Sequence, residues 1–402
     1  MDKNADVVVR SAELQKTKKQ KIMDALSGRF RLAPVIGALL IIWIVFQCIN
    51  SNFISSRNIS NLLLQIVSIG FSSCALFPLL VIGEFDLSLA NTGAAACGLL
   101  ALMTVENNGN IFVALVLCIL ACLAWGAING FIINYLHAPA FIVTLGGMMV
   151  MTGMLYFMLP ERTLSIGLTG TWLGWPTSTY LSTGVSFIFL AIAIVVLGIL
   201  RIQDYTQMKK YGQKAKAFNV VVLPLLLVAV IGSVAILILG LYKGVNVSVL
   251  ALLVLLAILY YVMTQTKFGV YIYAIGNSRE AARRAGINVE MVCIVARMFA
   301  TLIMGLAGVM SCSRLLAVNT QSMSTTLTLN AIAASTLGGA SMAGGRGNVW
   351  GILIGALVIG SLTNGLYLCQ APTAIMYTVQ GVILVLAIIL DSMITEASNT
   401  RK

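Results

Sequence analysis

Long apolar runs separated by short polar connectors make up most of the sequence. The runs cover about residues 33–49, 61–82, 88–105, 111–136, 140–159, 182–200, 218–241, 246–264, 292–313, 327–343, 350–369 and 373–391. About 20 consecutive apolar residues cross the roughly 30 Å hydrocarbon core of a bilayer as a helix. The pattern therefore predicts an all-α fold, a polytopic transmembrane helical bundle of about 10–12 spans.

Two of these runs are weaker than the others as independent spans. Residues 88–105 and 327–343 are rich in glycine, alanine and serine, so we expect them to be broken or half-helices. Small residues also recur four apart, at Gly126 and Gly130 and at Gly351 and Gly355. In membranes such spacing lets two helix backbones approach closely, so it predicts helix packing and says little about a solute.

Composition and charge agree with a membrane protein. Apolar residues make up 59% of the 402-residue chain and charged residues 9%, whereas about 25% of a soluble domain is charged. The net charge is +12, which in a soluble protein would suggest a nucleic-acid partner. Here the basic residues lie beside the apolar runs, where they set membrane topology. We therefore expect contact with membrane lipid and no nucleic-acid partner.

The basic connectors predict the orientation of the chain. If the N-terminus starts in the cytoplasm, the basic connectors 201–217, 265–291 and 344–349 all lie inside. The outside connectors then hold only Arg57, Arg162, Lys243 and Arg314. Both termini are thus predicted to be cytoplasmic. The expected organisation is an N-terminal tail over 1–32, a transmembrane domain over 33–395 and a C-terminal tail over 396–402.

Few residues in the sequence could carry out chemistry. His137 is the single histidine, and no phosphate-binding loop with its lysine is present. Nearly all eight cysteines fall in apolar runs, where packing is their expected role. We therefore predict no catalytic residue, no metal and no cofactor. Glu84 and Asp86 lie at a span end and Asp391 near the other end of the chain, which favours a transporter energised by a partner over an ion-coupled one.

One cytoplasmic connector contains a segment suited to dock a soluble motor. Residues 277–288 predict a short, basic, alanine-rich helix, with Asn277 or Ser278 as its N-terminal cap and Gly286 at its end. Taken alone, such a helix could equally be a solvated helix at the membrane interface.

Four blocks of sequence resemble the ribose/xylose-type permeases of ABC importers. They are residues 83–88 (GEFDLS), 139–146 (PAFIVTLG), 268–277 (FGVYIYAIGN) continuing to Asn288, and 329–334 (LNAIAA) leading into a glycine-rich stretch. The blocks stand in the family's order across most of residues 60–391. The motif residues are Gly83, Asp86, Ser88, Gly338, Gly339, Gly344 and Gly345.

The resemblance implies the permease subunit of an ATP-driven monosaccharide importer in the bacterial cytoplasmic (inner) membrane. Two permease subunits would form the pathway, an extracytoplasmic sugar-binding protein would deliver the solute, and a cytoplasmic ATPase with two nucleotide-binding modules would hydrolyse ATP. Segment 277–288 would then be the coupling helix, with Asn277, Arg279, Glu280, Ala282, Arg283, Arg284, Gly286 and Asn288 in contact with the ATPase.

The chain departs from the family pattern in two places. Glu84 replaces a small residue of the motif, and residues 183–241 hold two apolar runs where ribose-type members are shorter. The enlargement resembles the xylose and multiple-monosaccharide branch, which favours xylose or a similar pentose or hexose.

Several alternatives stay open from the sequence. The pathway candidates are Asn91, Thr144, Asn330, Thr363 and Asn364, and each could instead form an interhelical hydrogen bond. The solute could be a nucleoside or another small polar molecule. The remaining alternatives are an ion-coupled secondary transporter and, disfavoured by the lack of catalytic groups, a membrane enzyme.

Overall fold

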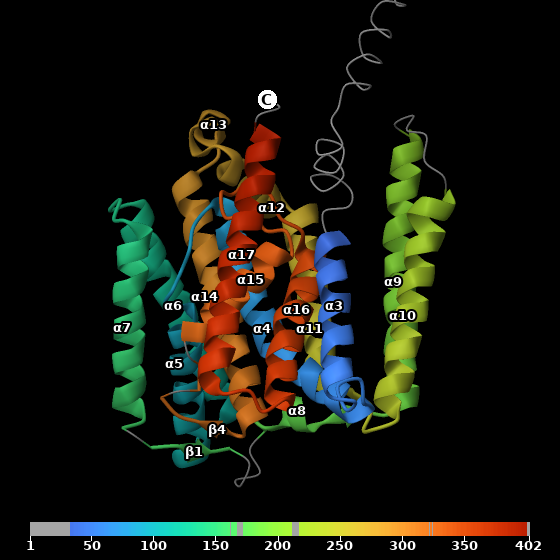
Figure 1. Ribbon diagram of the computed structural model, residues 1–402. Helices are drawn as coiled ribbons and strands as arrows, with labels where there is room; N and C mark the ends of the chain where they lie inside the picture. The colour runs from blue at the N-terminus through green and yellow to red at the C-terminus, as the bar shows by residue number, and fades with distance from the viewer. Residues whose placement is uncertain are drawn as a thin grey trace, which may run out of the picture.

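A bundle of long helices running along one common direction forms the described part of the chain (Figure 1). The computed structural model describes residues 33–160, 162–166, 172–210, 217–320, 322–323 and 325–399. The predicted N-terminal tail, part of the basic connector 201–217 and the last three residues of the C-terminal tail lie outside this range.

The helices and strands follow one another in this order: α3 (Ala33–Ile49), α4 (Ser56–Ile82), α5 (Leu89–Ala101), η1 (Leu102–Glu106), α6 (Ile111–Asn134), α7 (Ala140–Met158), β1 (Leu164–Ser165), α8 (Trp175–Ser178), β2 (Tyr180–Leu181), α9 (Thr183–Lys210), η2 (Phe218–Val222), α10 (Leu223–Gly240), β3 (Val245–Asn246), α11 (Val247–Gln265), α12 (Lys267–Asn277), α13 (Arg279–Arg284), α14 (Val289–Leu315), β4 (Ala317–Val318), α15 (Thr325–Leu337), α16 (Val349–Leu368) and α17 (Thr373–Asn399).

The prediction of an all-α transmembrane bundle is confirmed. Each predicted apolar run contains a helix, and nine helical segments among the described residues are long and apolar enough to cross a membrane. Several helices extend past the predicted limits: α4 begins at Ser56, and α9 continues to Lys210. The apolar pattern marks only the part of a helix in lipid, so it ends before the helix does.

The two weak runs behave differently from each other. The first forms α5 and continues without a break into η1, a π-helical turn, so the expected break is absent there. The second, α15, has 13 residues, and at 1.5 Å per residue it is about 20 Å long, too short to span the hydrocarbon core alone. This helix ends at Leu337, six residues before the predicted limit, and a glycine-rich loop follows it.

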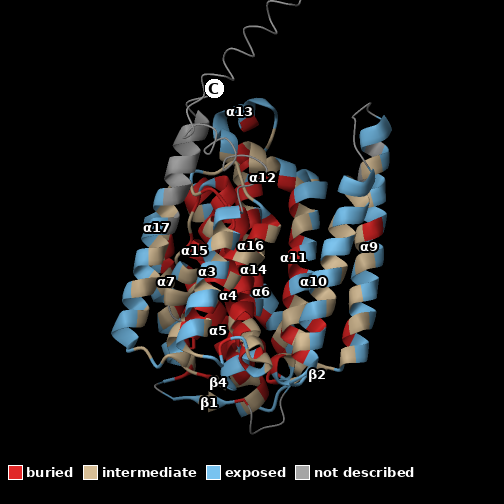
Figure 2. Ribbon diagram, turned by 45° about the vertical axis from the view of Figure 1, so that its right-hand side comes forward, coloured by how far each residue is buried: buried red, intermediate tan, exposed pale blue. Residues whose placement is uncertain are grey.

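Helices α4 and α14 form the buried centre of the bundle, with α15 and α16 beside them (Figure 2). Small residues allow the close packing there. Gly126 and Gly130 of α6 lie against the backbone of α14. Gly355 of α16 lies against the backbone of α15, and Gly351 lies against Gly338 directly after it. Both spacings of small residues read from the sequence are therefore helix contacts.

The enlarged region 183–241 forms a hairpin of α9 and α10 at the edge of the bundle (Figure 1). Its helices expose large apolar side chains such as Ile192, Val195, Leu226 and Val230. A helix that is apolar all round and still exposed belongs in lipid. At its base, β2 and β3 pair as a short antiparallel ladder, as do β1 and β4 elsewhere at the same end.

The start of α3 and the end of α17 lie at the same end of the bundle as α13 (Figure 1). We call this the α13 end. It is the arrangement that an even number of crossings requires. That both chain termini are cytoplasmic stays a prediction.

Candidate functional site

Three of the four sequence blocks meet at the α13 end. The end of α4, the end of α12 and the loop 338–348 pack together there. Gly345 donates its backbone N–H to the carbonyl of Val81 at 2.8 Å, and a Cβ atom at Gly276 would lie only 1.9 Å from the same carbonyl oxygen. The backbones are therefore too close for any side chain at position 276, which explains why this junction uses glycine.

The motif residues build the turns of this junction. Gly83 ends α4 with φ 87°, and Gly339, Gly344 and Gly345 have φ values of 96°, 86° and 74°, a region that disfavours other residues. Gly338 lies against the backbone of Gly351. These glycines are thus structural, and they hold the blocks in register.

A six-residue helix, α13, lies within the segment expected to dock an ATPase. Ser278 caps it by accepting a hydrogen bond from the N–H of Ala281, while Asn277 is the last residue of α12. Gly286 follows the helix with φ 84°, and Asn288 caps α14. Arg279, Glu280, Arg283 and Arg284 are exposed and Ala282 is buried. The helix is thus present, and its role as a docking element stays a prediction.

A buried ion-pair network lies beneath α13. The guanidinium of Arg297, a residue of α14 with no exposed surface, contacts the carboxylates of both Glu84 and Asp86. Its Nη1 donates to Oδ2 of Asp86 at 3.1 Å, and its Nη2 donates to Oε2 of Glu84. Ser88 donates its Oγ–H and its backbone N–H to the other oxygen of Asp86, at 2.6 and 2.9 Å. Both acids are therefore paired within the protein.

Arg279 extends the network to the surface. Its guanidinium donates to Oε1 of Glu84, and 43% of its side chain is exposed. Partial burial lowers the pKa of this guanidinium, the nearby Glu84 carboxylate raises it, and the net shift is upward. Two cations and two carboxylates therefore balance one another at this site.

Arg297 is a site residue that the sequence motifs did not single out. The apolar pattern places the acids Glu84 and Asp86 at a span end, and the structure shows that Arg297, buried within α14, is their cation. The signal was available, because Arg297 is the one charged residue in the predicted span 292–313. A charge in such a run requires a partner of opposite sign facing it from another helix or loop.

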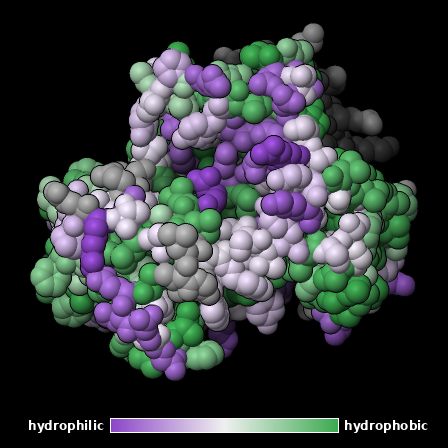
Figure 3. Space-filling model, turned by 90° about the horizontal axis from the view of Figure 1, so that it is seen from below, coloured by the Kyte–Doolittle hydropathy of each residue, from purple (hydrophilic) through white to green (hydrophobic). Residues whose placement is uncertain are grey.

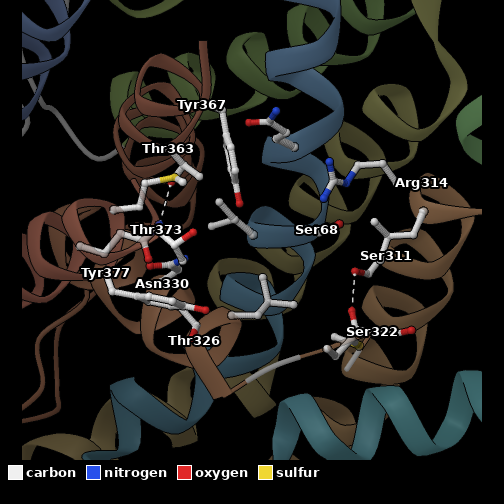
Figure 4. Close-up of a pocket in the computed structure, with 17 residues that line it drawn as sticks. Ser68, Ser311, Arg314, Ser322, Thr326, Asn330, Thr363, Tyr367, Thr373 and Tyr377 are labelled. Carbon is white, nitrogen blue, oxygen red and sulfur yellow. Dashed lines mark hydrogen bonds between the residues drawn. The ribbon is translucent and has the colours of Figure 1, made fainter. Parts of the chain in front are cut away.

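A polar cavity of about 550 Å³ lies at the opposite end of the bundle. That volume falls within the ~300–1,000 Å³ of small-molecule pockets. Its polar lining comes from five helices and one loop (Figure 4): Gln65 and Ser68 of α4, Ser311 and Arg314 of α14, Ser322 of the loop before α15, Thr326 and Asn330 of α15, Thr363 and Tyr367 of α16, and Thr373, Tyr377 and Gln380 of α17. Arg314 is the one charged residue among the described residues of this lining.

Two buried polar atoms of the described cavity lining have no hydrogen-bond partner. Oε1 of Gln65 and Oγ of Ser68 are buried without a hydrogen-bond partner in the described part of the chain. Tyr367 points into the cavity from the top of the view and Arg314 from its right-hand side (Figure 4). Seen from this end of the bundle, hydrophilic residues gather near the middle of the face and along its left-hand edge, and hydrophobic residues lie mainly to either side of the middle (Figure 3).

The structure separates the five pathway candidates. Asn330 and Thr363 line the cavity. Asn91 donates to Oγ1 of Thr152 at 2.7 Å, and Asn364 accepts from Asn58 at 2.9 Å, so both join helices instead. Thr144 is buried and donates to a backbone carbonyl of its own helix. Their roles in transport stay predictions.

Metal ligands are not grouped in the described part of the chain, where no three His, Cys, Asp or Glu residues could hold an ion together. Cys118 and Cys122, which share a face of α6, are both buried. The thiol of Cys118 donates to the carbonyl of Ala96 at 2.8 Å, so this pair contributes to packing.

Comparison with known proteins agrees with the fold. Residues 58–388 match the family described as branched-chain amino acid transport system / permease component. The chain is 33% identical over 359 residues to the xylose transport system permease protein XylH of Escherichia coli (strain K12), covering 89% of this chain and 91% of that protein. It is 27% identical to the ribose import permease protein RbsC of Bacillus subtilis (strain 168), over 95% and 98% of the two chains. No solved structure matches.

The match covers most of the described bundle, including the four blocks, the α13 segment and the cavity. Members of the family are transport components, and the apolar helices identify a multi-pass membrane protein. The chain therefore belongs to this family of transport permeases, as a permease of the ribose/xylose ABC type.

Proposed function

We propose that the chain is the membrane-spanning permease subunit of an ATP-driven importer for a monosaccharide, xylose or a similar pentose or hexose. The similarity to permeases named for xylose and ribose supports this solute class. The observation that carries the proposal is the cavity at the end away from α13. Its hydroxyl, amide and guanidinium groups match the many hydroxyls of a sugar, and its tyrosine rings offer apolar faces.

Arg314 is the principal donor for the solute in this proposal. A guanidinium presents five N–H donors in a planar fork, and no described residue forms an ion pair with Arg314. Its donors are thus free for sugar oxygens. Asn330 and Thr363 complete the polar lining from α15 and α16.

The opposite end of the bundle lies in the cytoplasm in this proposal. There α13 docks a cytoplasmic ATPase with two nucleotide-binding modules, on which ATP is hydrolysed. An extracytoplasmic sugar-binding protein delivers the solute to the cavity end, and a second copy of the permease completes the pathway. The exposed arginines of α13 support the docking role, and a bacterial inner membrane follows from the similarity to bacterial permeases.

Two alternatives use the same observations. A nucleoside or another small polar solute also carries hydroxyls and fits the polar lining, so it stays the nearest rival. An ion-coupled secondary transporter is less favoured, since the described cavity lining contains no carboxylate that could carry a proton or cation.

Reconstituted vesicles test the proposal. The permease, the ATPase and the binding protein are incorporated together, and uptake of labelled xylose, ribose and a nucleoside is measured with and without ATP. We expect ATP-dependent uptake of a monosaccharide. Uptake that survives without ATP but collapses with an uncoupler would establish the secondary transporter instead.

Matched variants tie uptake to the cavity. Arg314→Gln removes the charged donor that hydrogen-bonds the solute in this proposal. Such a bond is worth about 1.5–3 kcal/mol, so KM for the solute should rise ~10–100-fold. Arg57→Gln is the control, since Arg57 is exposed in the first turn of α4, outside the cavity. An unchanged KM in Arg314→Gln would remove Arg314 from the solute site.

A further inference from the structure

Glu84 joins three separate parts of the structure through one carboxylate. Its Oε1 accepts from Arg279 at the start of α13, and its Oε2 accepts from Arg297 in α14. Glu84 itself follows α4, and only 6% of its side chain is exposed. The turn at Gly83 fixes its backbone, because the N–H groups of Gly83 and Glu84 bond to carbonyls of the last turn of α4, each at 2.9 Å.

The other charged side chains of α13 form only local pairs. Arg283 contacts Glu290 and Arg284 contacts Glu280, each at 2.5 Å and within the stretch 280–290. These side chains are exposed or partly exposed, so the pairs contribute little. The pair between Arg279 and Glu84 instead spans 195 residues of sequence and ends on a buried carboxylate. Among the described side chains, it is the ion pair that ties α13 to the α4 end.

Charge balance separates the role of Glu84 from that of its neighbours. Removal of Asp86 or Arg297 leaves a buried charge without one of its partners. If Glu84 loses its charge, Arg297 still has Asp86 at 3.1 Å, and Arg279 is exposed enough to be solvated. Folding should therefore tolerate the loss of this carboxylate better than the loss of either neighbour.

The helices joined by Glu84 also reach the cavity. The opposite part of α14 supplies Ser311 and Arg314 to the lining, and α4 supplies Gln65 and Ser68. A displacement of α13 would thus act on two of the helices that line the polar cavity.

We propose that Glu84 is a positioning residue, whose carboxylate clamps α13 to α4 and α14 so that movement of α13 changes the cavity. The proposal rests on the proposed function, in which α13 docks the ATPase. It adds a defined link between hydrolysis on the partner and the solute site. Without the clamp, α13 moves while α4 and α14 lag behind, and ATP is hydrolysed with less solute moved.

The first test measures coupling in vesicles holding the full transporter. Glu84→Gln and Arg279→Gln should each lower the solute moved per ATP several-fold, and the double variant should be no worse than either single one. Glu106→Gln is the control, since Glu106 pairs with Arg162 at 2.7 Å and both are partly exposed. A normal ratio in both single variants, or losses that multiply in the double variant, would overturn the proposal.

The second test needs neither ATPase nor transport. Hydrogen exchange of the α13 backbone is followed in the purified permease, and Glu84→Gln and Arg279→Gln should speed it several-fold while Glu106→Gln leaves it unchanged. Unchanged exchange in both variants would refute the clamp even if the protein imports sugar. If the two variants exchange faster but the wild-type transporter shows no ATP-driven uptake, the proposed function is refuted and the clamp is kept. Should Glu84→Gln fail to accumulate, Arg279→Gln alone decides, because its side chain is half-exposed.

Discussion

Arg297 and Asp86 form a buried ion pair, 3.1 Å between Nη1 and Oδ2, across 211 residues of sequence. The pair fixes α14 to the loop between α4 and α5. Both side chains have no exposed surface, so neither charge can be solvated when its partner is lost.

Replacement of Arg297 by methionine should destabilise the protein by about 3–5 kcal/mol, because Asp86 and Glu84 are left buried without their shared cation. Thermal unfolding of the detergent-purified protein measures the loss. Arg162→Met is the control, since it breaks a partly exposed pair with Glu106 worth about 0–1 kcal/mol. Equal melting temperatures for both variants would show that the buried network contributes nothing.

The exposed arginines of α13 should govern ATPase docking. Replacement of both Arg283 and Arg284 by glutamate reverses their charge and should abolish co-purification of the ATPase while the permease stays folded in the membrane. The matched control reverses Lys209 and Lys210, which are exposed at the end of α9 on the same side of the bundle (Figure 1). Unchanged co-purification in the α13 variant would count against docking at this helix.

Gly276→Ala should damage the junction of the sequence blocks. Its Cβ would lie 1.9 Å from the carbonyl oxygen of Val81, and such overpacking costs about 1–3 kcal/mol. Gly381→Ala provides the comparison, because its Cβ meets nothing within 4 Å. The melting temperatures of the two variants measure the loss of stability. A Gly276→Ala protein as stable as wild type would contradict the close approach of the Gly276 and Val81 backbones.

Asn364→Leu should lower stability without altering the solute site. The side chain accepts from Asn58 at 2.9 Å in a buried contact, and loss of a buried partner costs about 1–3 kcal/mol. Asn330→Leu should show the reverse, a higher KM with little loss of stability, since Asn330 lines the cavity. Thermal unfolding and uptake on both variants separate helix packing from solute contact, and a KM effect confined to Asn364→Leu would reverse the assignment.

Much of the fold could be predicted from local composition. Membrane-spanning backbone must satisfy its own hydrogen bonds, so a long apolar run becomes a helix whatever its neighbours are. Helices such as α6 and α16 therefore lie within about three residues of their predicted limits. The short α15 could also be expected from local composition, because Gly338 and Gly339 interrupt its apolar run.

Apolar runs and composition were therefore enough to locate the helices, to place the protein in a membrane and to identify the short exposed helix α13. The packing of the folded chain was needed to show that Arg297 pairs with Glu84 and Asp86, that Asn330 lines a cavity, and that Asn364 contacts another helix. These helices are apolar both toward lipid and toward one another. Their hydrophobic pattern then does not reveal which face turns inward, and the partner of a polar residue emerges only when the helices pack.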